Sequence, residues 1–331
     1  MTILVTGAAG FVGMHLVQAL LARGERVVGI DNLNAYYDPA LKEARVAELE
    51  RTSGFTLVRL DIAEFERLAT WALMDGRDVT GVVHLAAQAG VRHSLDRPFD
   101  YVRSNLTGHL AVLELCRHHL PALEHLVYAS SSSVYGANRK VPFSTQDRAD
   151  HPVSLYAATK RADELISEAY ARLYGLPQTG LRFFTVYGSW GRPDMAYYSF
   201  TDAIAAGRPI TLFNHGRMRR DFTWIDDVVV GVLAALDRPP PATDAGTPPH
   251  RIYNLGSSQP IELLTFVRTL EQAMGRPAEL RFAEMQPGDV QETFADIDAT
   301  TRDLGWAPVT GIEEGIARFV AWHRRYHESR S

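Results

Sequence analysis

A strand-sized apolar segment that runs directly into a glycine turn constrains the fold of this chain more than any other feature. Residues 3–5 read Ile-Leu-Val, glycines recur at every third position across residues 7–13, and residues 14–23 are typical of a helix that ends before Gly24. Such a turn lets the backbone approach a pyrophosphate closely, and the N-terminus of the helix attracts phosphate. The pattern predicts a dinucleotide-binding turn. The residues expected to touch the ligand are Gly7, Gly10, Phe11, Val12 and Gly13.

Apolar runs then alternate with helical stretches through the first half of the chain. Further strands are expected over residues 26–30, 55–60, 81–87, 126–129 and 181–188. This alternation predicts an α/β fold with a Rossmann-type, doubly wound parallel sheet, in which ligands bind at the carboxyl ends of the strands. We expect residues 1–180 to form the nucleotide-binding domain and residues 181–331 to form mainly a smaller α/β substrate domain, with the chain crossing between the two.

The residues at the strand ends indicate which dinucleotide binds. Asp31, followed by Asn32, ends the second strand about 20 residues beyond the glycines. An acid at this position accepts hydrogen bonds from the adenosine ribose hydroxyls and repels a 2′-phosphate, so the sequence favours NAD over NADP. Other predicted contacts are the adenine-edge pair Asp61 and Ile62, and Leu85, Ala86 and Ala87 after the fourth strand. His84, within that strand, is interpreted as structural.

Tyr156 and Lys160 are the candidate catalytic pair. They are four residues apart, so on a helix they share one face. A fixed ammonium beside a phenol favours the phenolate, which can then act as a general base toward an alcohol hydroxyl. The serine run at residues 130–133 leaves the fifth strand about 25 residues earlier, and a hydroxyl there can hydrogen-bond a substrate oxygen.

Composition and charge exclude several function classes. The 331 residues carry a formal net charge of -5, which argues against nucleic-acid binding. A single cysteine, Cys116, excludes an internal disulfide framework and fits a reducing cytosol. The sequence shows neither a signal peptide nor an apolar stretch long enough to span a bilayer, so we expect a cytoplasmic protein without membrane contact. No metal site is predicted.

These motifs, in this order and spacing, resemble the extended short-chain dehydrogenase/reductase family, specifically its NAD-dependent nucleotide-sugar epimerases. The resemblance covers nearly the whole chain. It implies that Ser131 assists Tyr156, that Lys160 binds the nicotinamide ribose, and that the substrate is a UDP-sugar. It also implies a homodimer, formed by the helix that carries Tyr156 and by a preceding long helix at residues 98–119.

Two positions of the serine run separate reaction types. Relatives that dehydrate or decarboxylate nucleotide sugars carry acidic side chains at one or both of the positions that Ser132 and Ser133 occupy here. Elimination needs a proton acceptor and donor beside the sugar, and neither serine supplies a carboxylate. Oxidation and reduction at C4 remain possible, and both serines are expected to contact the substrate.

Residues 183–196 and 31–38 resemble UDP-glucuronate 4-epimerases in particular. By that resemblance Thr185 and Arg192 contact the sugar carboxylate, and a guanidinium fork suits a carboxylate. Arg220 would hold the diphosphate and Asp289 the nucleotide ribose. Asp226 and Asp227 are interpreted as helix N-capping residues.

The predicted function is therefore an isomerase that converts UDP-glucuronate to UDP-galacturonate through a 4-keto intermediate. Three alternatives stay open at this point. They are a UDP-glucuronate decarboxylase, a UDP-galactose 4-epimerase, and a non-catalytic NAD-binding regulator.

Overall fold

A seven-stranded sheet organises the computed structural model, which describes residues 1–241, 247–285 and 290–328. Its strands lie in the order β10-β6-β5-β4-β1-β2-β3, and every neighbouring pair is parallel. Their bounds are β1 Thr2–Thr6, β2 Arg26–Asp31, β3 Phe55–Arg59, β4 Val79–His84, β5 His125–Ser131, β6 Gln178–Phe183 and β10 His250–Leu255. The chain order reverses between β1 and β4. This arrangement confirms the predicted Rossmann-type α/β fold.

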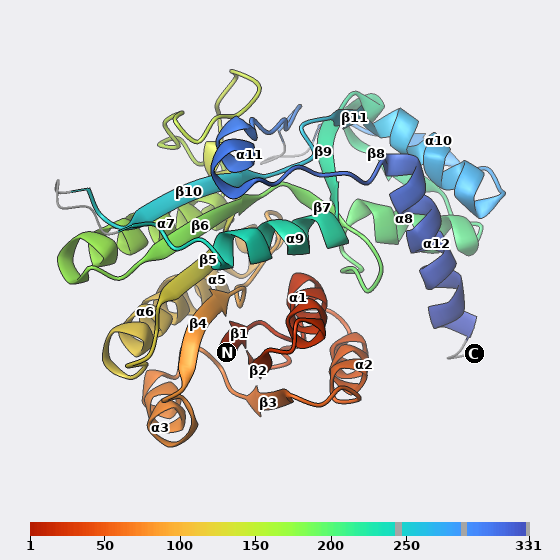
Figure 1. The fold of residues 1–331 in the computed structure, drawn as a ribbon. Coiled ribbons are helices and arrows are strands. Elements are labelled where there is room, and N and C mark those ends of the chain that lie inside the picture. The colour runs from red at the N-terminus through yellow and green to blue at the C-terminus, as the bar shows by residue number, and fades with distance from the viewer. Residues whose placement is uncertain (242–246, 286–289, 329–331) are drawn as a thin grey trace.

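Helices cover both faces of this sheet (Figure 1). On one face α1 lies between α2 and α9, and on the other α6 lies between α3 and α7. Their bounds are α1 Phe11–Ala22, α2 Pro39–Leu49, α3 Phe65–Asp75, α6 Gly108–His118, α7 Leu155–Tyr174 and α9 Ile225–Leu236. Because the sheet is covered on both sides, the central strand β1 is buried along its whole length.

The second half of the chain adds two small sheets and a group of helices. Strands β7 Thr185–Tyr187, β9 Arg219–Trp224 and β11 Pro260–Glu262 form one sheet, and β8 Ile210–Leu212 pairs with β12 Leu280–Phe282. The helices are α8 Ala196–Ala205, α10 Leu263–Met274, α11 Asp298–Leu304 and α12 Ile312–Glu328. One hydrophobic core includes Leu20 of α1, Val228 of α9 and Phe319 of α12, so both halves of the chain share it.

Two predictions about local structure were wrong. The strand expected over residues 181–188 is two strands, β6 and β7, which break at Phe184 and join different sheets. The run is apolar on both sides of the break, so periodicity alone did not reveal the change of partner. The N-capping interpretation of Asp226 and Asp227 was wrong as well, since both lie in the first turn of α9 rather than at its N-cap. Asp227 Oδ2 instead accepts the backbone N–H groups of Val309 and Thr310 at 3.2 and 2.9 Å.

The long helix expected before the serine run is divided. It consists of α5 Pro98–Tyr101, the π-helical turn η1 Val102–Thr107 and α6, preceded by the short helix α4 His93–Asp96.

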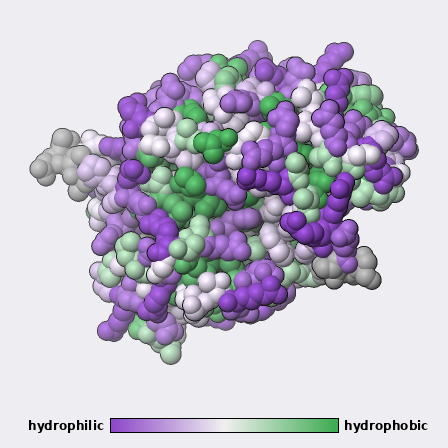
Figure 2. Space-filling view, turned by 45° about the vertical axis from the view of Figure 1, so that its right-hand side comes forward, coloured by the Kyte–Doolittle hydropathy of each residue, from purple (hydrophilic) through white to green (hydrophobic). Residues whose placement is uncertain are grey.

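Figure 2 shows a largely hydrophilic face with hydrophobic side chains in patches near its centre. Among the described residues, every helix falls short of the length and apolar character that crossing a bilayer requires. The predicted division of the chain at residue 180 falls within β6. Strand β10 of the second half joins the sheet of the first half, so this sheet extends across the predicted boundary. The division into two domains remains a prediction.

Candidate active site

One cavity of about 460 Å³ lies at the carboxyl ends of the parallel strands. Its lining includes residues that follow β1, β2, β3, β4 and β5, together with the start of α7 and the segment after β7. The reversal of strand order between β1 and β4 opens a crevice at this edge, because the connections leave in opposite directions. All predicted site residues within the described ranges line this cavity. Asp289 lies outside the described residues.

The glycine turn forms the floor of the cavity beside β1. Gly7 adopts a positive φ of +73°, and a Cβ added there would stand 2.7 Å from the backbone nitrogen of Ala86. A Cβ on Gly13 would overlap the carbonyl oxygen of Gly7. Gly10 is the N-cap of α1, without a side-chain cap, so the first turn of the helix faces the cavity with backbone groups. The turn therefore presents N–H groups and a positive helix end to any bound anion.

An acidic residue closes the next strand. Asp31 is 8% exposed, and its carboxylate accepts the backbone N–H groups of Ala9 at 3.1 Å and Leu33 at 2.8 Å. These bonds fix the carboxylate, while each oxygen keeps lone-pair capacity for a ligand hydroxyl. Asn32 follows it in the cavity wall. Asp31 is thus held where a ribose-binding acid is expected.

The ends of β3 and β4 complete this wall. Asp61 accepts the N–H of Ala63 at 2.9 Å and pairs with Arg103 at 3.2 Å, and buried Ile62 lies beside it. Leu85, Ala86 and Ala87 continue from β4 along the cavity. His84 is buried within β4 and contacts Thr6 Oγ1 at 2.7 Å; burial, followed by the charge of Lys160, lowers its pKa to about 3. A neutral, buried imidazole agrees with its structural interpretation.

The serine run and α7 meet on the opposite side of the cavity. The hydroxyl of Ser131 accepts the N–H of Ser133 at 3.1 Å, in the 3₁₀ turn η2 Ser132–Tyr135. Ser154 caps α7 by accepting the N–H of Ala157 at 3.1 Å. This cap lies two residues before Tyr156, whose ring centroid is 6.1 Å from that of Tyr101. Ser131, Ser132, Ser133, Tyr156 and Lys160 all line the cavity.

Lys160 is held by buried partners. Its ammonium donates to the carbonyl of Ala129 at 3.0 Å and to Asp163 Oδ2 at 3.1 Å, and its side chain is 4% exposed. Burial raises the pKa of Asp163 to about 6, although the charge of Lys160 opposes that rise. The chain therefore fixes the cation one helical turn after Tyr156, at the base of the cavity.

A second buried ionic group lies beneath the serines. Glu164 accepts from Ser130 Oγ at 2.6 Å, from Arg182 at 2.8 Å through both of its oxygens, and from Arg161 at 2.9 Å. Burial favours the neutral form of Glu164, but these hydrogen bonds outweigh burial and lower its pKa. The network ties the end of β5 to α7 and β6. Sequence reasoning missed it, although an acid beside Lys160 and an arginine within an apolar strand were visible signals.

The segment after β7 adds a cation to the cavity lining. Arg192 forms a two-pronged ion pair with Asp194, at 3.1 and 2.8 Å, and its guanidinium lies 6.0 Å from the ring centre of Tyr36. Burial opposes the charge of Arg192, but the charge and hydrogen bonds of Asp194, together with the nearby phenols, outweigh burial and raise the pKa of Arg192. Tyr36 also donates to Asp194 at 3.1 Å, and burial raises the pKa of its phenol to about 12. A carboxylate ligand can bind Arg192 by replacing Asp194 on the same fork.

Thr185 and Arg220 complete the predicted set. Thr185 begins β7, and Arg220 of β9 donates to the carbonyls of Arg219 and Gln291 at 3.0 and 3.2 Å. Both line the cavity. Lining residues that sequence reasoning did not assign include Tyr36, Lys42, Gln88 and Thr293. Lys42 donates to Asn34 Oδ1 at 2.8 Å, and burial lowers its pKa.

Several known proteins are similar to this chain over nearly its whole length. A model of the NAD dependent epimerase/dehydratase family matches residues 3–256. The chain is 49% identical to UDP-glucuronate 4-epimerase 4 of Arabidopsis thaliana, over 98% of this chain and 76% of that protein. It is 47% identical to a probable UDP-glucuronate 4-epimerase of Rhizobium meliloti (strain 1021), over 99% of each. The crystal structure of UDP-glucuronic acid 4-epimerase from Bacillus cereus in complex with UDP-glucuronic acid and NAD is similar, with a TM-score of 0.87, 34% identity and coverage of 98% of this chain and 100% of that chain.

Proposed function

Because this chain belongs to the NAD dependent epimerase/dehydratase family, we propose that it is an isomerase that converts UDP-glucuronate to UDP-galacturonate through a 4-keto intermediate. One observation carries the proposal: a single cavity is lined by the glycine turn, by Tyr156 with Lys160, and by Arg192. The similarity of this chain to UDP-glucuronate 4-epimerases, over at least 98% of its length, supports the same substrate.

The residues present fit NAD. Gly7 and Gly13 allow the turn to pack tightly, because a Cβ at either position would meet backbone atoms, and the N-terminus of α1 lies in the cavity lining. Asp31 stands where it can accept the ribose hydroxyls, and its charge disfavours a 2′-phosphate. Asn32, Asp61, Ile62, Leu85, Ala86 and Ala87 form the remaining wall. When bound, NAD supplies a hydride acceptor for C4 of the sugar and then a hydride donor.

The chain's own groups move the proton at O4. Tyr156, as the phenolate, takes this proton and later returns it, acting as general base and then general acid. Lys160 favours the phenolate and is itself fixed by Ala129 and Asp163. Ser131 hydrogen-bonds O4 and orients it. Ser132 and Ser133 contact the sugar without supplying the carboxylate that decarboxylating relatives carry, so we favour the isomerase over the lyase.

The second half of the cavity selects the sugar. Arg192 and Thr185 bind the C6 carboxylate, which is the group that distinguishes a uronate from a hexose such as galactose. Arg220 binds the diphosphate. Asp289, outside the described residues, binds the nucleotide ribose. In this proposal residues 1–180 mainly hold NAD, and residues 181–331 mainly hold the UDP-sugar.

We also propose a homodimer. Large apolar side chains are exposed on α5, η1, α6 and α7, which is the helical face expected to pair with a second copy. They are Phe99, Val102, Leu110, Leu165, Leu173 and Tyr174. Cys116 is a buried free thiol, which fits a reducing compartment, and we propose the cytoplasm as the location.

Product analysis tests the proposed reaction. The purified protein is incubated with UDP-glucuronate and NAD, and the products are resolved by NMR, with UDP-galactose as a parallel substrate. We expect UDP-galacturonate from the uronate and much slower turnover of UDP-galactose. A UDP-pentose with CO2 would support the decarboxylase instead. Absence of turnover with bound NAD would support a regulator.

A further inference from the structure

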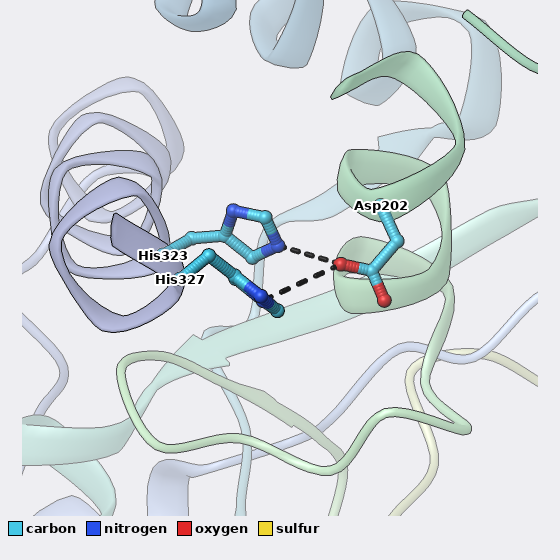
Figure 3. Close-up of side chains that lie close together, drawn as sticks. All are labelled: Asp202, His323 and His327. Atoms are coloured by element: carbon cyan, nitrogen blue, oxygen red, sulfur yellow. Dashed lines mark hydrogen bonds and ion pairs between the residues drawn. The ribbon is translucent and has the colours of Figure 1, made fainter. Parts of the chain in front are cut away.

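Three side chains that commonly bind metal ions meet away from the cavity, where α12 packs beside α8. Figure 3 shows His323 and His327 projecting from α12 toward Asp202 of α8. His323 Nε2 lies 2.6 Å from Asp202 Oδ1, and His327 Nε2 lies 3.7 Å from the same oxygen. One candidate ligand atom from each residue lies within 4.8 Å of the other two. None of the three lines the cavity, so the cluster is independent of the proposed reaction.

The positions of the two histidines follow from helix geometry. Residues four apart lie one turn above each other on the same face, which is the spacing that lets two imidazoles share one ion. Their ring centroids are 4.3 Å apart. His323 is 5% exposed and packs edge-on against Tyr198 at 5.5 Å, so its ring is held in place. The side chain of His327 is 49% exposed, which leaves the cluster open to solvent on one side.

Asp202 lies close to both histidines. His327 Nε2 lies beyond hydrogen-bond distance of Asp202, yet it points at the same carboxylate oxygen. Ligands of a tetrahedral zinc ion, at about 2.0–2.1 Å from the metal, lie about 3.3 Å apart. The observed 2.6 and 3.7 Å separations bracket that value, so small side-chain rotations would admit an ion.

We propose that Asp202, His323 and His327 bind one divalent transition-metal ion, with Zn²⁺ as the representative ion. Two imidazole nitrogens and one carboxylate oxygen suit Zn²⁺ and its neighbours in the first row, whereas Mg²⁺ and Ca²⁺ prefer oxygen ligands. Water completes the shell on the exposed side. The ion joins α12 to α8 and thereby fixes the helix whose Trp322 packs on Trp190, at 5.4 Å between ring centroids.

Calorimetric titration of the full chain with ZnCl2, after removal of chelator, tests this site. We expect one Zn²⁺ per chain and no heat of specific binding with MgCl2. His327→Gln removes the exposed ligand without disturbing the His323–Asp202 hydrogen bond, and it should weaken Zn²⁺ binding at least about 10-fold. Asp202→Asn keeps a hydrogen-bond acceptor for His323 and should weaken binding similarly.

His215→Asn is the matched control. The side chain of His215 is also 49% exposed and lies 3.0 Å from Glu284, but within the described ranges it belongs to no group of three metal-binding side chains. This variant should bind Zn²⁺ as the parent chain does. Zn²⁺ should also raise the melting temperature of the parent by about 2 °C and leave that of His327→Gln unchanged. Failure of the parent to bind one Zn²⁺, or equal affinity in parent and His327→Gln, would overturn the proposal.

Discussion

The two halves of the cavity differ in whether backbone or side-chain contacts shape them. The wall proposed for NAD is shaped by backbone contacts within the glycine turn and against Ala86, and its acid Asp31 is held by two backbone N–H groups. The wall proposed for the sugar depends on long side chains, and its central cation Arg192 already has a carboxylate partner in Asp194. A ligand fits into the first wall, whereas in the second it must share or replace an existing ion pair.

This contrast shows how one scaffold can keep its cofactor and vary its substrate. A backbone cradle tolerates few substitutions, because an added Cβ meets other backbone atoms. A side-chain cradle changes its selectivity when one residue is exchanged. Tyr156 stands where the two walls meet, and the buried partners of Lys160 and Glu164 hold that junction.

Replacing Tyr156 by Phe should have the largest effect, because it acts on both halves at once. We expect turnover of UDP-glucuronate to fall about 1000-fold with the loss of the general base, while NAD binding persists. The measurements are product formation by NMR and the NAD content of the purified chain. Tyr170→Phe, on the same helix with its hydroxyl on Glu114 at 2.6 Å, is the control and should keep its turnover. Unchanged turnover in Tyr156→Phe would show that Tyr156 is not the general base.

Glu164→Gln should cost stability rather than chemistry. The substitution leaves Arg182 buried without its charge partner, and such a change typically costs about 3 kcal/mol. Urea denaturation measures the loss. Glu48→Gln breaks an exposed ion pair with Arg51 and should cost far less. Equal stability of the Glu164 variant and the parent would mean that the buried network does not hold the junction.

Gly13→Ala probes the backbone wall. The added methyl group would overlap the carbonyl of Gly7, so the turn must shift and NAD affinity should fall about 100-fold. Fluorescence titration with NAD provides the measurement. Gly311→Ala is the matched control, since a Cβ there meets nothing closer than 3.8 Å. If Gly13→Ala binds NAD as tightly as the control, the packing of the glycine turn does not determine NAD affinity.

Arg192→Lys probes the side-chain wall. A lysine keeps the charge but loses the fork, so KM for UDP-glucuronate should rise about 10-fold while NAD affinity stays constant. Steady-state kinetics measure KM for UDP-glucuronate, and the same fluorescence titration measures NAD affinity. Arg208→Lys, at an exposed position outside the cavity, should change neither. A loss of NAD affinity in Arg192→Lys would show that the walls are not separable.

The smallest predicted effect is a loss of stability in acid, which arises from two buried histidines of the central sheet. Burial lowers the pKa of His125 to about 4 and that of His84 to about 3, from an ordinary value of 6.5. Because the folded pKa values are depressed, the stabilisation is fully present above pH 6.5 and is lost as the pH falls toward them. Each histidine should lower the free energy of unfolding at pH 5.5 by about 1 kcal/mol relative to pH 7.5.

Urea denaturation between pH 7.5 and 5.5 measures that slope. His125→Gln removes one titrating group, so its stability should fall less steeply with acid than that of the parent. His151→Gln, at an exposed position, should leave the slope unchanged. Equal slopes for the His125 variant and the parent would mean that His125 does not titrate in this way.

The backbone wall was the more predictable half. Glycine spacing after an apolar strand fixes its own local geometry, so the turn, Asp31 and the Tyr156–Lys160 helix could be placed from sequence, and all of them line the cavity. The ion pair of Arg192 with Asp194, its contact with Tyr36 and the partners of Glu164 could not be found that way. These contacts depend on how segments from distant parts of the sequence pack together. The break between β6 and β7 was missed for the same reason.

The fate of the hydrogen at C4 tests the central claim most directly. UDP-glucuronate that carries deuterium at C4 is incubated with the protein in ordinary water, and UDP-galacturonate is examined by NMR. The account predicts a product that keeps deuterium at C4, because a hydride taken from that carbon returns to it while only the O4 proton passes through Tyr156. UDP-galacturonate with hydrogen from water at C4 would contradict it.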